Sequence, residues 1–310
     1  MEQSKAIYEQ ATMPLNSIPI TQALQLQAQR LSVNDIIPLL LPFISLVTWA
    51  AFLKDIHIGQ MNNLGLVSVL PLPTIFSFIL ITVSFCLTLC QPRLRAPLIL
   101  FHIFVLIFML FSTTNFVEDT VRFSTVYRHA GYTEYIMRTG SVDPRLDAYF
   151  NWPGFFIFSA LLTQLAGYHD ILQYAAWAPV FLNLLYLPPL YVLLTTATTD
   201  RRLIWLSIGL FYITNWIGQD YYSPQGLCFF FYLTLLAIVL KWFKVAPDLR
   251  IPRRLCFLRP VICSLPFTDR LHTWLIEPDA LHTPVSDSKQ KWLLVLFIAI
   301  FSFLVYSHPL

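Results

Sequence analysis

The sequence predicts an all-α fold: a polytopic transmembrane bundle of about seven spans plus one interfacial or re-entrant helix. Of the 310 residues, 56% are hydrophobic and 12% are charged, and the mean hydropathy is +0.62. Soluble globular proteins carry roughly 25% charged residues, so this chain lacks the polar surface that solubility requires. Its apolar residues form long continuous runs, whereas a membrane β-barrel would show short alternating segments.

The N-terminal segment is polar and rich in glutamine, and it contains no short apolar core followed by a cleavage site. A removable signal peptide is therefore not expected, and we predict a cytoplasmic tail at residues 1–35 before a transmembrane domain at residues 36–310. Most candidate spans can cross a hydrocarbon core of about 30 Å at ~1.5 Å per residue. The candidates are Ile36–Leu53, Leu66–Leu89, Pro97–Ser112, Ile171–Leu194, Leu203–Ile217, Leu227–Phe243 and Trp292–Val305.

Basic residues between the spans predict the topology, because arginine and lysine are enriched in cytoplasmic loops. They gather at Arg93 and Arg95, at Arg201 and Arg202, and in the long basic loop at residues 244–290. We therefore expect these three loops to lie on the cytoplasmic face together with the N-terminus.

The apolar stretch Phe155–Leu165 is too short to span a bilayer comfortably. If it did span, Arg95 and Arg201 would lie on opposite faces, so we expect an interfacial or re-entrant helix instead. Residues 113–170, the loop GQDYYSPQ and the terminal SHPL then all lie on the extracytoplasmic face.

The first extracytoplasmic loop is residues 113–170, and its part from residue 114 to residue 156 contains five acids and several arginines. Asp119 lies a few residues beyond the third predicted span, where a carboxylate can act as a general base or bind a divalent cation. Asp147 precedes the NWPG turn, although Trp152 in this turn also fits a plain interfacial anchor. For every charge in the loop, a solvated helix face is the alternative.

The stretch IGQDYYSPQG lies between two apolar runs and is the second polar segment of interest. Ser223 and Pro224 favour a helix start, which places Gln225 where free backbone N–H groups attract anions. Asp220 adds a charge and Tyr222 an amphipathic ring, so a phosphate can dock there. The alternative is an ordinary loop with tyrosines at the membrane interface. His308, in YSHPL, lies on the same predicted face and is more often incidental than catalytic in such a position.

The sequence lacks the motifs of several common classes of catalytic and binding site. It contains no GxGxxG, GK[ST], HExxH or GxSxG motif, which argues against dinucleotide, nucleoside-triphosphate, zinc-protease and serine-hydrolase sites. The five cysteines show no disulfide framework or zinc spacing. No basic cluster is interleaved with aromatic residues, so no nucleic-acid partner is expected.

The layout resembles the GT-C class of polytopic glycosyltransferases, which use sugars linked to polyprenyl phosphate. The residues that carry the resemblance are NWPGFFIFSALLTQLAG, AAWAPVFLNLLY, NWIGQDYYSPQG and the terminal YSH, over roughly residue 113 to the end. The similar sequences are large bacterial membrane proteins. The resemblance implies a bacterial cytoplasmic membrane, an extracytoplasmic site, a polyprenyl-phosphate sugar donor and contact with membrane lipids.

In that class, an acid of the first extracytoplasmic loop serves as general base or helps to bind a divalent metal such as Mg²⁺ or Mn²⁺. Asp119 is the first match for this acid and Glu118 the second, with Asp119 the expected metal ligand. The resemblance implies a binding site for the donor and its phosphate that comprises Arg122, Arg128, Asp220, Tyr222 and Gln225. Asp147 and His308 are the secondary candidates.

This chain departs from the class in two respects. Its acid follows the third predicted span, whereas the class usually places the acid after the first, and the chain is shorter than such enzymes normally are. A truncated frame or a non-catalytic membrane subunit is therefore one alternative. A transporter or flippase of lipid-linked or small solutes is another, although the predicted spans contain few polar residues.

Overall fold

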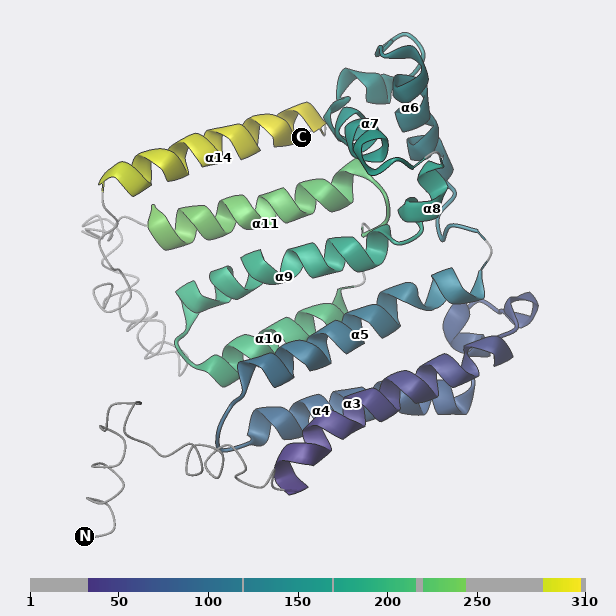
Figure 1. Ribbon diagram of the computed structural model, residues 1–310, viewed down its shortest axis with the longest axis vertical. Helices are drawn as coiled ribbons and strands as arrows, with labels where there is room; N and C mark the ends of the chain where they lie inside the picture. Colours follow the sequence, from purple (N-terminus) through teal and green to yellow (C-terminus); the bar gives the residue numbers. More distant parts are fainter. Residues whose placement is uncertain (1–32, 119, 169, 216–219, 244–286, 308–310) are drawn as a thin grey trace, which may run out of the picture.

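A computed structural model describes residues 33–118, 120–168, 170–215, 220–243 and 287–307. Within these ranges the secondary structure is helical, without strands. The long helices lie side by side in one array (Figure 1). They are α3 (Val33–Phe52), α4 (Leu72–Cys90), α5 (Ala96–Val117), α9 (Ala178–Ala197), α10 (Arg201–Thr214), α11 (Pro224–Trp242) and α14 (Asp287–Ser307).

In the described part of the chain, five helices are long and apolar enough to cross a membrane. They are α4, α5, α9, α11 and the stretch Ile37–Asp55, which joins α3 to the short helix η2 (Leu53–Asp55). The all-α architecture with membrane-spanning helices is thus supported. The count of seven spans stays a prediction, because α10 has only 14 residues and the apolar part of α14 runs over Lys291–Ser307.

In two of the predicted spans, the structure has two helices in place of one, because a new helix begins inside the span. The predicted span Ile171–Leu194 splits into the short helix α8 (Ile171–Ala175) and α9, whose first turn contains Pro179. The predicted span Leu66–Leu89 splits in the same way into η4 (Leu66–Val69) and α4, with Pro71 directly before α4. Proline has no N–H to donate to a preceding turn and restricts the residue before it, so a helix begins there more readily than it continues.

A compact group of shorter helices covers one end of the array (Figure 1). We call it the α6–α8 subdomain; it contains α6 (Thr125–Thr139), η5 (Ala148–Asn151), α7 (Gly154–Ala166) and α8. It lies where α5 and α14 end and where α9 and α11 begin. At 13 residues, α7 is about 20 Å long and packs on α6 outside the row of long helices, which agrees with the expected non-spanning helix.

The opposite end of the array carries the connections between α4 and α5 and between α9 and α10. The guanidinium of Arg202 donates a hydrogen bond to the carbonyl oxygen of Gln91 at 2.9 Å, which joins these two connections. Asp200 accepts from the backbone N–H groups of Arg202 and Leu203 and so caps α10. The two short basic loops of the sequence therefore meet at one end of the array, with the α6–α8 subdomain at the other.

Buried polar side chains join the first three long helices. The imidazole of His102 on α5 lies 2.9 Å from the hydroxyl of Ser84 on α4 and 2.7 Å from the carbonyl oxygen of Leu98. The indole N–H of Trp49 donates to the hydroxyl of Thr113 at 3.1 Å and joins α3 to α5. Because lipid offers these groups no alternative partners, such bonds favour helix association in a membrane.

Gly209 lets α10 approach α4 closely. A Cβ atom added at Gly209 would lie 2.7 Å from the buried ring of Phe85. We predict that Gly209→Ala lowers the free energy of unfolding by about 1–3 kcal/mol, the usual cost of overpacking, and lowers the melting temperature in detergent.

Two further variants test this cause. Adding Phe85→Leu to Gly209→Ala should restore part of the lost stability, since the smaller side chain makes room. Gly131→Ala, where an added Cβ meets nothing within 4 Å, is the control and should not lower the melting temperature. An unchanged melting temperature for Gly209→Ala would show that the two helices are not in close contact.

Candidate functional site

The turn from Asp220 to Gln225 connects the long helices to the α6–α8 subdomain. Ser223 is the N-cap of α11, and its hydroxyl accepts from the backbone N–H of Gly226 at 3.1 Å. Pro224 is the first residue of the helix and Gln225 the second, as the sequence predicted. The carboxylate of Asp220 is buried and accepts from the side-chain amide of Asn183 on α9 at 3.0 Å. Asp220 thereby fixes the turn against the long helices.

Tyr222 fixes the other side of the turn to the α6–α8 subdomain. Its carbonyl oxygen lies 2.9 Å from Nδ1 of His129, and its hydroxyl lies 2.9 Å from that of Thr133, both on α6. Its ring packs against Phe155 of α7 and Tyr174 of α8. Burial raises the pKa of the Tyr222 phenol, so it serves as a neutral hydrogen-bonding group. Both its hydroxyl and its carbonyl oxygen are used within the protein, and the donor-binding role of Tyr222 stays a prediction.

An aromatic cluster extends from the Asp220–Gln225 turn toward solvent. The ring of Tyr221 stacks on His129 with centroids 6.0 Å apart and contacts Phe123 with centroids 4.9 Å apart. His129 also contacts Tyr149 at 5.5 Å. The guanidinium of Arg122 lies over Phe123, 4.8 Å from the ring centroid, so an exposed cation flanks the cluster.

Arg128 and Asp147 form an ion pair on the same side of the subdomain. The guanidinium and carboxylate are 2.6 Å apart, and Tyr132 hydrogen-bonds to both. Partial burial works to raise the pKa of Asp147, but hydrogen bonds from Tyr132, the Tyr149 backbone and Arg128 outweigh it and lower that pKa to about 2. A carboxylate this acidic is a poor general base at neutral pH. The pair is better suited to holding η5 on α6.

The acid expected at the end of the third span is described only in part. Glu118 is half-buried directly after α5, and its backbone N–H donates to the carbonyl oxygen of Thr114 at 2.8 Å. Asp119, the first candidate for the catalytic acid and for a metal ligand, lies outside the described residues, as does His308. Among the described residues, no group of three or more His, Cys, Asp or Glu side chains could hold a metal ion. The Mg²⁺ or Mn²⁺ site therefore stays a prediction without support from this part of the chain.

Two residues that hold the Asp220–Gln225 turn in place were not predicted from the sequence to be part of the site. His129 is fully buried, and its Nε2 has no hydrogen-bond partner. Asn183 is also fully buried and holds Asp220, while its own side-chain oxygen has no partner. An amide in the middle of an apolar run is a signal that could have identified Asn183. His129 gave no such signal, because it lies among other polar residues.

Comparison with protein family models, with curated proteins and with solved structures finds no match.

The burial of His129 predicts a pH-dependent stability. Burial lowers the pKa of His129 below its ordinary value of 6.5, the hydrogen bond to Tyr222 opposes this shift, and the neighbouring charge of Arg128 adds to it. The unfolded state therefore binds the proton more tightly than the folded state. The free energy of unfolding should be unaffected by this group above pH ~6.5 and should fall below it, by at most about 1.4 kcal/mol per pH unit.

The measurement is the melting temperature of the detergent-solubilised protein between pH 7.5 and pH 5. His129→Asn retains a donor near the Tyr222 carbonyl oxygen but does not titrate in this range. It should show a smaller loss between these two pH values than the wild type, whatever its stability at pH 7.5. Equal losses in the two proteins would assign the effect to other groups.

Proposed function

We propose that the chain is a GT-C-like membrane glycosyltransferase that takes a sugar from a polyprenyl-phosphate donor at the extracytoplasmic face. The supporting observation is the direct contact between two polar segments, residues 118–149 and residues 220–225, at one end of a set of apolar helices. The hydrogen bonds of Tyr222 with His129 and Thr133 make this contact across about ninety positions of sequence. A lipid-linked substrate needs such an arrangement, with polar groups beside a membrane-exposed surface.

The charges near this contact suit an anionic lipid headgroup. Arg122 is exposed beside Phe123 and Tyr221, and Arg128 lies over the ring of Tyr149 with its guanidinium 5.5 Å from the centroid. Arginine binds phosphate oxygens in a bidentate manner and also stacks on aromatic rings. In this proposal Arg122 binds the donor phosphate, whereas Arg128 contributes a weaker field because Asp147 already neutralises it.

The proposed reaction is a displacement at the anomeric carbon of the donor sugar. An acceptor hydroxyl loses its proton to a carboxylate, its oxygen forms the new bond to the anomeric carbon, and the bond to the phosphate oxygen breaks. Polyprenyl phosphate leaves with the electron pair. Asp119 and Glu118 are the proposed bases, and Asp220 has a positioning role through Asn183.

A transporter or flippase is less well supported by the described helices. Within α4, α5 and α9 there is no Asp, Glu, Lys or Arg. The imidazole of His102 and the amide nitrogen of Asn183 bond to neighbouring protein groups. A coupled pump usually needs charged or free polar groups along a pathway within the spans.

The test is transfer of labelled sugar from polyprenyl-phosphate donors by the full chain reconstituted in liposomes. Asp119→Asn and Glu118→Gln should identify the base, the correct one losing about 100-fold or more of the rate. Arg122→Gln should raise the donor KM or lower kcat by about tenfold or more, because charge-assisted phosphate contacts stabilise both bound donor and leaving group.

The matched controls are Asp143→Asn and Arg138→Gln, which are exchanges of the same kind elsewhere in the loop and in α6. Both should retain transfer. If neither acid variant slows transfer, the assigned bases are wrong. If the wild type carries donors across the bilayer without cleaving them, the chain is a flippase and not a transferase.

A further inference from the structure

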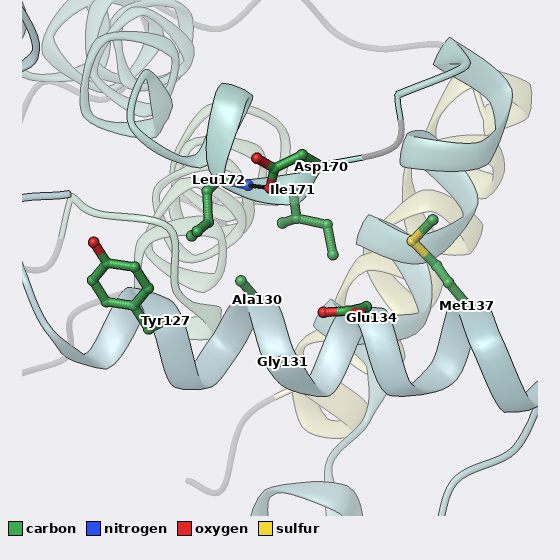
Figure 2. A pocket seen from close by; sticks show the side chains of 8 residues that line it. All are labelled: Tyr127, Ala130, Gly131, Glu134, Met137, Asp170, Ile171 and Leu172. Carbon is green, nitrogen blue, oxygen red and sulfur yellow. Dashed lines mark hydrogen bonds between the residues drawn. The ribbon is translucent and has the colours of Figure 1, made fainter. Parts of the chain in front are cut away.

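A pocket of about 390 Å³ opens on the α6–α8 subdomain, between α6 and the start of α8. Figure 2 shows side chains of α6 directed toward the segment at residues 170–172, across the pocket. None of the residues that line this pocket belongs to the proposed transferase site. The lining comprises Tyr127, Ala130, Gly131, Glu134, Met137, Asp170, Ile171 and Leu172.

The sequence of α6 explains why the pocket is hollow. Tyr127, Ala130, Gly131 and Glu134 recur at intervals of three and four residues, so they lie on one helix face. The two middle residues are the smallest available, and the large side chains stand on either side of them. A Cβ atom added at Gly131 would meet nothing within 4 Å, so the space in front of this glycine is open.

Among the described residues, the lining of the pocket has negative charge and no positive charge. Glu134 and Asp170 are its charged residues there, and no described lysine, arginine or histidine lines it. One oxygen of Asp170 accepts from the backbone N–H of Leu172 at 2.9 Å, which fixes the carboxylate at the rim (Figure 2). In the described part of the chain, the carboxylate of Glu134 takes part in no hydrogen bond or ion pair.

The remaining lining indicates an organic ligand. Tyr127 provides an aromatic ring, and Met137, Ile171 and Leu172 provide apolar surface. At two carboxylates a divalent cation keeps most of its coordination shell as water, and such a hydrated cation leaves the aromatic and apolar lining unused. An ammonium group is attracted both to carboxylates and to the face of an aromatic ring, and its methyl or methylene groups pack on apolar side chains.

We propose that this pocket binds a small organic cation with a primary or quaternary ammonium group. The ammonium lies between Glu134 and Asp170, and its carbon substituents contact Tyr127 and Met137. This binding does not depend on sugar transfer and holds whether or not the chain is a glycosyltransferase.

The first experiment compares two probes of the same shape and different charge. Choline and its neutral isostere 3,3-dimethyl-1-butanol are titrated against the full chain in a maltoside detergent, with binding read by saturation-transfer NMR. Choline should bind at least about tenfold more tightly, since charge and cation–π attraction act on it alone. Equal affinities would overturn the proposal, as would Ca²⁺ or Mg²⁺ displacing choline at equal concentration.

The second experiment fills the pocket without disturbing the fold. Gly131→Leu puts a side chain into the open space and replaces a poor helix former by a good one, so the melting temperature should not fall. Choline binding should be lost in this variant and weakened at least about fivefold in Glu134→Gln. Asp143→Asn, which removes one carboxylate charge outside the pocket, is the matched control and should bind as the wild type does. Retained binding in a folded Gly131→Leu would refute the site.

Discussion

Tyr222 is the residue on which the arrangement of the two parts of the molecule depends. It follows the buried Asp220, which is held by a long helix, and precedes the N-cap of another. Its hydroxyl and carbonyl oxygen bond to α6, and its ring lies among the helices of the subdomain. The polar turn is therefore a structural joint first, and any binding surface is built around it.

The membrane environment explains why this joint is made of hydrogen bonds. Lipid is as apolar as a leucine side chain, so apolar packing alone gives little preference for one helix arrangement over another. Buried polar pairs such as His102 with Ser84, and Asn183 with Asp220, have no competing partners in lipid. They select one arrangement of helices, and the apolar residues around them then pack accordingly.

The sequence predicts the long helices well because twenty apolar residues in a row have few alternatives in a membrane. It also predicts the start of α11, since Ser223 and Pro224 carry a local signal. It misses the break between α8 and α9, because Pro179 lies inside an otherwise continuous apolar run. The contact of His129 with Tyr222 is beyond any local pattern, since the two are 93 positions apart. The ion pair of Arg128 with Asp147 depends on how η5 packs on α6, which no spacing rule contains.

The separation of 93 positions between His129 and Tyr222 has a consequence for biosynthesis. At about 5–20 residues per second, the ribosome needs roughly 5–20 s to extend the chain from α6 to the turn before α11. During this interval the faces of α6 and α7 that later pack around Tyr222 have no partner from the turn. His129 and Phe155, which contact Tyr222 in the folded chain, lack that contact until the turn is made. The subdomain is made first and completed late, so its assembly waits for the insertion of two helices that follow it in the chain.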